Sequence, residues 1–132
     1  MKTSYLIIYW AARLIAAVIL LQTLFFKFSG ASESVEIFTR VGMEPWGRLG
    51  VGVLELIASV LILVNATAWI GAGLAFGLMA GAIFLHLTVL GISVQNDGGY
   101  LFFLAIIVLI CSGVILTMNR QKIIHFLKSF SS

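Results

Sequence analysis

The sequence predicts an all-α fold: a polytopic membrane bundle of four helices, in one domain that covers residues 1–132. Hydrophobic residues make up 61% of the chain and charged residues only 10%, whereas soluble domains carry about 25% charged residues. Four apolar runs also recur, each near the ~20 residues that a helix needs to span the hydrocarbon core. Because backbone polar groups find no water in lipid, these runs are expected to be helices in an antiparallel bundle.

The four runs define the expected spans. They cover residues of about 5–28, 46–64, 68–90 and 100–118, and an amphipathic tail follows at 119–132. The first run contains Arg13 and is longer than the apolar core of a signal peptide, so we expect it to be retained as a membrane helix. The tail is expected to continue the fourth helix or to lie along the lipid headgroups.

The long connection between the first two runs predicts a short amphipathic helix. Ser32 is expected to cap its start, with Glu33 in the first turn. Gly42 can end it in the left-handed conformation. This helix either lies on the membrane surface or covers the bundle as a lid. The other connections are shorter: Asn65 ends the second span, and 95–99 has the residues of a turn.

The distribution of basic residues predicts the orientation. Four spans place both termini on one side, which carries Lys2, Arg120, Lys122 and Lys128, against Lys27, Arg40 and Arg48 on the other. Four against three favours cytoplasmic termini under the positive-inside rule. Since the basic residues are scattered and half of them flank apolar runs, we expect the lipid bilayer as a partner and no nucleic acid.

Glu55 is the residue that most needs an explanation. It lies well inside the apolar run 48–64, where a carboxylate costs about 2.5 kcal/mol or more. At 1.5 Å per residue, Glu55 lies roughly 10 Å and His86 roughly 6 Å from the outer ends of their helices. Lys27 lies at the outer end of the first helix, so the three side chains are expected at similar depth. They are the candidates for ligand binding or proton exchange, while catalytic residues stay unknown.

A purely structural interpretation of the same residues stays open. It is an ion pair of Glu55 with Lys27 or Arg48, together with a histidine that is hydrogen-bonded to a neighbouring helix. Secondary polar residues in or beside the spans are Arg13, Gln22, Arg48 and Ser59. By helical angle Arg13 and Lys27 can both face the bundle axis, Gln22 points nearly opposite to Arg13, and Ser59 shares a small, polar face with Glu55.

The third run carries a glycine stripe, which consists of Gly73, Gly77 and Gly81. Small residues at this spacing let another backbone approach closely. We expect helix packing inside the bundle, with a homodimer face as the alternative. One histidine and one glutamate in the membrane fall short of the three or four ligands of a metal site, so no metal is expected. No covalently bound cofactor is expected either, and haem held by two histidines would need His125 from a dimer.

Several short motifs, in this order, resemble the DoxX family. They are Arg13-Leu14, Phe26-Lys27-Phe28, Val41-Gly42-Met43, Leu54-Glu55-Leu56 and Leu85-His86-Leu87. The resemblance implies a four-helix protein of the bacterial-type inner membrane. It also implies an association with quinone-linked oxidoreductases, notably a thiosulfate:quinone enzyme, and with responses to oxidative stress. A quinone is then the candidate ligand, and a soluble or membrane redox protein is the candidate partner.

The small size favours an accessory or anchoring subunit over an enzyme that acts alone. A second function stays open, in which the protein binds or isomerises a small lipophilic molecule with Glu55 and His86 as acid and base. A third is a small proton-coupled exporter. The small multidrug resistance transporters also have four helices and one membrane carboxylate, but they carry it on the first helix. Here that helix has Arg13 and Lys27, which repel cationic substrates.

Overall fold

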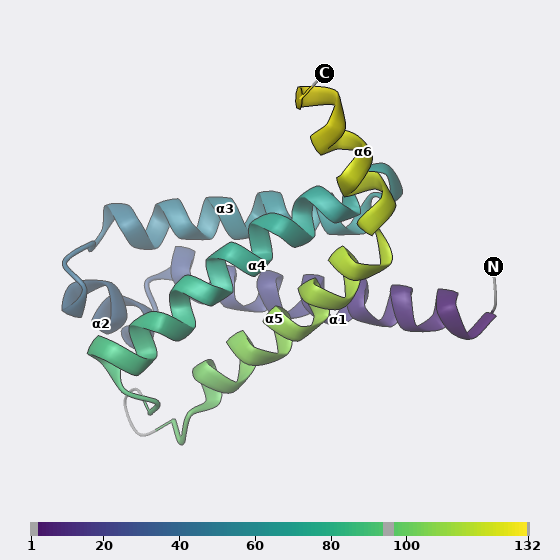
Figure 1. Cartoon of the computed structure of the whole chain (residues 1–132). Coiled ribbons are helices and arrows are strands. Elements are labelled where there is room, and N and C mark those ends of the chain that lie inside the picture. The colour runs from purple at the N-terminus through teal and green to yellow at the C-terminus, as the bar shows by residue number, and fades with distance from the viewer. Residues whose placement is uncertain (1–2, 94–96, 132) are drawn as a thin grey trace.

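The computed structural model describes residues 3–93 and 97–131, which form helices and no strand (Figure 1). The four spans are α1 (Thr3–Ser29), α3 (Trp46–Leu63), α4 (Ala68–Leu85) with the π-helical turn η2 (His86–Leu90), and α5 (Tyr100–Met118). All four are long and apolar enough to cross a membrane. The predicted membrane bundle is confirmed, and its spans agree closely with the apolar runs. Four predicted positions lie outside the described residues: Lys2, Gln95, Asn96 and Ser132.

The spans form an antiparallel bundle in which α1 and α4 each pack against both α3 and α5. The short 3₁₀ helix η1 (Asn65–Thr67) joins α3 to α4 at the end that also carries both chain termini. We call this the terminal end. The opposite end carries α2 (Ser32–Arg40) and the loop between η2 and α5, and we call it the α2 end.

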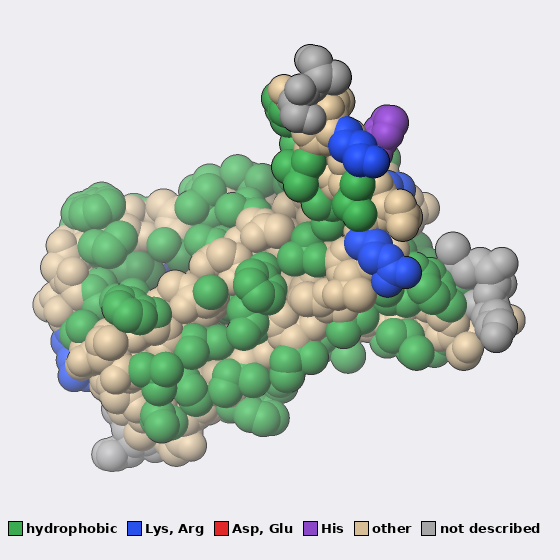
Figure 2. Space-filling view, viewed as in Figure 1, with side chains coloured by type: hydrophobic (Ala, Val, Ile, Leu, Met, Phe, Trp, Pro, Cys, Tyr) green, Lys and Arg blue, Asp and Glu red, His purple; other side chains and the backbone are tan. Residues whose placement is uncertain are grey.

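Small side chains fill much of the space between the helices. The fully or nearly buried alanines are Ala12, Ala16, Ala17, Ala58, Ala68, Ala72, Ala75 and Ala105. In lipid no hydrophobic force drives helices together, so close van der Waals packing of small residues stabilises the bundle. Large apolar side chains cover the outer surface instead, as the green patches of Figure 2 show.

Helix α4 approaches α3 closely at Gly71. A Cβ atom there would lie 2.7 Å from both the Ala58 carbonyl oxygen and the Ile62 nitrogen of α3. The glycine stripe is exposed instead: Gly73, Gly77 and Gly81. The close helix contact expected at the stripe is therefore not made within the described chain, and a homodimer face stays a prediction. Two residues along a helix turn the side chain by about 200°, so when Gly71 faces α3, Gly73 faces away from it.

The α2 helix ends as predicted but begins differently. Gly42 has φ +78°, and the Met43 amide donates to the Phe38 carbonyl at 2.7 Å, which is the pattern of a glycine-capped helix end. Ser32 does not cap the start, because Ala31 occupies the N-cap position and Ser32 is already helical. Phe38 is buried beneath this helix.

The tail forms a separate helix, α6 (Arg120–Ser131), that turns away from α5 and runs across the bundle axis. Phe126 packs edge-to-face on Trp69 of α4, with ring centroids 5.3 Å apart. Ile124, Leu127 and Phe130 stay exposed, while Lys and Arg side chains follow another edge of α6 (Figure 2). The tail therefore does not continue α5 as one straight helix, and its position along the headgroups stays a prediction.

Candidate functional site

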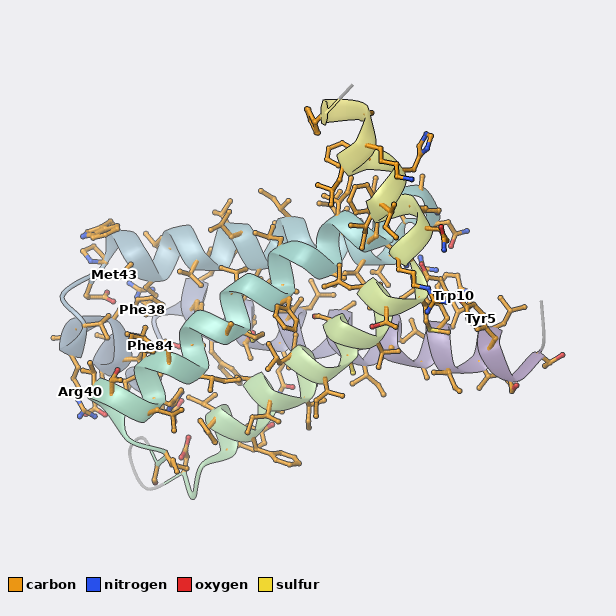
Figure 3. The ribbon with its side chains drawn as sticks, viewed as in Figure 1. Tyr5, Trp10, Phe38, Arg40, Met43 and Phe84 are labelled. Carbon is orange, nitrogen blue, oxygen red and sulfur yellow. The ribbon has the colours of Figure 1, made fainter. Side chains whose placement is uncertain are left out.

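A cavity of about 450 Å³ lies inside the α2 end of the bundle. Its walls come from α1, α3, α4 and α5, and α2 contributes Glu33, Ser34, Ile37 and Phe38. Figure 3 shows Phe38 and Met43 at this end with Phe84 of α4, and all three residues line the cavity. Most of the lining is apolar, and the volume suits a small ligand. We call this space the α2 cavity.

Two charged residues of the spans meet in the wall of the α2 cavity. The Lys27 Nζ atom of α1 lies 2.9 Å from the Glu55 Oε1 atom of α3, and both residues line the cavity. Glu55 is only 1% exposed. The Thr23 hydroxyl lies 3.4 Å from the other carboxylate oxygen but closer, at 3.1 Å, to the Leu20 carbonyl. Lys27 is therefore the principal partner of Glu55. Of the two ion pairs that the sequence left open, Glu55 with Lys27 or with Arg48, the structure contains the pair with Lys27.

Arg48 binds Glu44 and the backbone next to this pair, and not the Glu55 carboxylate. Its Nη2 atom lies 2.9 Å from Oε1 of Glu44, and its Nη1 atom donates to the backbone carbonyl of Lys27. The last carbonyls of a helix have no partner within the helix, so this arginine satisfies one of them at the end of α1. On the same side, the Phe28 ring fills the space where a Cβ atom of Gly52 would lie.

His86 does not join the Lys27–Glu55 pair. It is buried, its Nδ1 atom lies 2.9 Å from the Gly91 carbonyl oxygen, and its ring packs edge-to-face on Phe102 of α5. It is not among the described residues that line the α2 cavity. The sequence predicted the depth of His86 along its helix, but depth does not determine the direction of a side chain. The His86 ring lies in the π-helical turn and points to α5.

The remaining predicted polar residues lie elsewhere. Gln22 is exposed and its amide lies 3.4 Å from the Tyr100 hydroxyl. The Ser59 hydroxyl donates within its own helix, to carbonyls one turn earlier. Arg13 is fully buried near the terminal end, where its Nη1 atom donates to the Asn65 side chain at 2.8 Å. None of these lines the α2 cavity within the described part of the chain.

Arg40 holds α2 over the cavity, a role that the sequence did not reveal. Its Nη1 and Nη2 atoms donate to the carbonyls of Leu90 (3.1 Å) and Val89 (2.9 Å). These carbonyls belong to η2, whose C-terminal end leaves them without helical partners. In the sequence, Arg40 counted only as one of the basic residues on the side opposite the termini.

We expect Arg40→Ala to loosen α2 without unfolding the bundle. Hydrogen bonds from a charged group contribute about 1.5–3 kcal/mol each, so amides of α2 should exchange with solvent deuterium about tenfold faster or more. Hydrogen–deuterium exchange of the full chain in detergent measures this. Arg120→Ala is the matched control, because that arginine is exposed on α6. Unchanged exchange in α2 would contradict the anchoring role.

The glycines at positions 77 and 81 also line the α2 cavity. At both, no heavy atom of the described chain lies within 4 Å of an added Cβ atom. Two of the three stripe glycines therefore form part of the cavity wall, at positions where no side chain fills the space.

Comparison with known proteins gives one match. A family model described as DoxX matches residues 8–88, which include Lys27, Glu55, His86 and the glycine stripe. Neither the curated proteins nor the solved structures gave a match. The matched segment, from α1 to η2, makes up more than half of the 132 residues. With four membrane-spanning helices and this match, the chain belongs to the DoxX family.

Proposed function

We propose that the protein is an accessory or anchoring subunit of a quinone-linked redox or oxidative-stress complex, and that the α2 cavity binds the quinone head group. The observation that carries this proposal is the Lys27–Glu55 pair in the wall of a largely apolar cavity. A quinone combines a flat apolar ring with carbonyl acceptors. The Lys27 ammonium group can donate to a carbonyl oxygen, while apolar walls take the ring.

In this proposal the chain binds and orients the quinone, and the redox partner supplies the electrons. Glu55 acts as the counter-ion that holds the Lys27 ammonium group in place. We place both termini in the cytoplasm and the protein in a bacterial-type inner membrane, because the basic residues favour that orientation. The α2 cavity then lies in the outer half of the bilayer.

The second candidate is a binder of small lipophilic molecules that has no redox partner. The same cavity favours it, since apolar walls accept many ligands of this size. An isomerase that uses Glu55 with His86 finds less support, because the histidine faces α5 and not the cavity.

Glu55→Gln tests the quinone site. Without the carboxylate the ammonium group is free to turn away, and we expect the affinity for a short-chain ubiquinone to fall about tenfold. Isothermal titration calorimetry of the full chain in maltoside detergent measures the affinity. Glu36→Gln is the matched control, because it makes the same change on α2 at a residue that does not line the cavity.

Two results would contradict the quinone site: no binding by the wild type, or equal affinity in Glu55→Gln. A hydrocarbon of the same size without carbonyl groups separates the candidates. Equal affinity for it would favour the general lipophilic binder. The subunit role is tested in membrane vesicles from cells with and without the chain, with thiosulfate as donor, and equal rates of quinone reduction would end it.

A further inference from the structure

The geometry points to a second ligand site, at the terminal end of the bundle, that binds a phosphate oxyanion through Arg13. This site lies apart from the α2 cavity and shares no lining residue with it. The inference is independent of the proposed quinone function.

Arg13 is a buried cation with an unused donor. Its residue exposure is 0%, its Nε atom donates to the Ile62 carbonyl at 2.8 Å, and Nη1 is taken by Asn65. The Trp10 ring covers one face of the guanidinium group, with its centroid 3.8 Å from Cζ. The Nη2 atom has no hydrogen-bond partner among residues 3–93 and 97–131. A buried charge that lacks full pairing is costly, so this donor calls for an acceptor.

The chain offers no carboxylate for that purpose. Residues 1–32, 56–96 and 98–132 contain no Asp or Glu. The five acidic residues of the sequence are Glu33, Glu36, Glu44, Glu55 and Asp97. None of them lines the cavity beside Arg13. An anion that neutralises this arginine must therefore come from outside the chain.

A cavity of about 470 Å³ adjoins Arg13, and we call it the terminal cavity. It also has walls from Trp10, Asn65, Asn119 and Lys122, so α1, η1 and α6 all take part. Figure 3 shows Tyr5 and Trp10 at this end, next to the start of α6. The guanidinium of Arg13 and the exposed ammonium of Lys122 thus border one space. Arginine with lysine is a donor set that suits phosphate oxygens.

The ligand chemistry follows from where the terminal cavity lies. The amphipathic helix α6 crosses this end of the bundle at headgroup level, so the phosphate of an anionic phospholipid can enter. Inorganic phosphate carries the same oxygens. Trp10, which is 38% exposed, lines the terminal cavity and lies against the guanidinium face.

Thermal unfolding of the full chain tests the site. In neutral maltoside micelles, we expect the midpoint to rise when either dioleoylphosphatidylglycerol or inorganic phosphate binds, because a ligand of the native state stabilises it. Dioleoylphosphatidylcholine at the same mole fraction controls for the acyl chains. Native mass spectrometry counts bound lipid directly.

Two variants probe the donors separately. Lys122→Gln, at an exposed position, should weaken binding of the effective ligand about fivefold without affecting folding, and Arg13→Gln should weaken it about tenfold or more. Lys128→Gln is the control, since it removes the same charge from α6 outside the cavity. If Arg13→Gln fails to fold, Lys122→Gln alone decides.

The outcomes separate the sources of phosphate. A response to phosphatidylglycerol alone assigns the site to a lipid headgroup, and a response to inorganic phosphate assigns it to a free anion. If the inference is right, the response to either probe is weaker in Lys122→Gln and unchanged in Lys128→Gln. No response to either probe, or equal responses in Lys122→Gln and Lys128→Gln, would overturn it.

Discussion

Lys27→Met should lower the free energy of unfolding by about 3–5 kcal/mol, because it strands a buried carboxylate. Glu55 is 1% exposed, and Lys27 is its principal partner. Removing the acid instead, as in Glu55→Met, should lower the free energy of unfolding by less. Lys27 keeps 17% of its side chain exposed, and its flexible stem can carry the charge outward. Unfolding of the full chain in mixed micelles with increasing sodium dodecyl sulfate, followed by circular dichroism, measures the difference.

A double variant separates the pair from local packing. Lys27→Met with Glu55→Met removes both charges, and we expect it to recover most of the lost stability, since a buried ion pair is often replaceable by apolar residues. Lys128→Met is the surface control and should change stability by less than about 0.5 kcal/mol. If the double variant is as unstable as Lys27→Met, the loss stems from the methionine and not from the unpaired acid.

Gly71→Ala should destabilise the bundle by about 1–3 kcal/mol relative to Gly73→Ala. A Cβ atom at Gly71 would lie 2.7 Å from two backbone atoms of α3, which can move only if α3 and α4 separate. At Gly73 the nearest atom is a side-chain carbon of Leu116 at 4.0 Å. Alanine favours a helix over glycine equally in both variants, so the comparison isolates packing.

The same detergent titration measures both glycine variants. Equal stabilities would show that α3 and α4 do not touch at Gly71. A loss at Gly73→Ala alone would instead assign the glycine stripe to a contact between copies of the chain, the alternative that the sequence left open.

The fold was accessible from the sequence because the apolar runs are long and well separated. The ion pair was partly accessible as well, since depth along each helix placed Lys27 and Glu55 at one level. Direction was not accessible for His86, whose ring lies in a π-helical turn that an ideal 3.6-residue repeat does not describe. The same limit applies to α4, where the spacing of the glycines is visible but the face that meets α3 is not.

Two further features required coordinates. A cavity is space between helices, and no residue pattern marks it. The partners of Arg13 were also hidden: the Ile62 carbonyl belongs to the last turn of α3, where carbonyls lack helical partners and accept from a side chain instead. Sequence reasoning let Arg13 face the bundle axis but named no partner for its guanidinium group.

The α2 cavity owes part of its volume to what Gly77 and Gly81 leave out. Both line it, and an added Cβ atom would meet open space at either one. The cavity is thus encoded in the sequence by two residues of α4 that have no side chain. One leucine at either position would plug it from within while the Lys27–Glu55 pair and the α3–α4 contact stayed as they are.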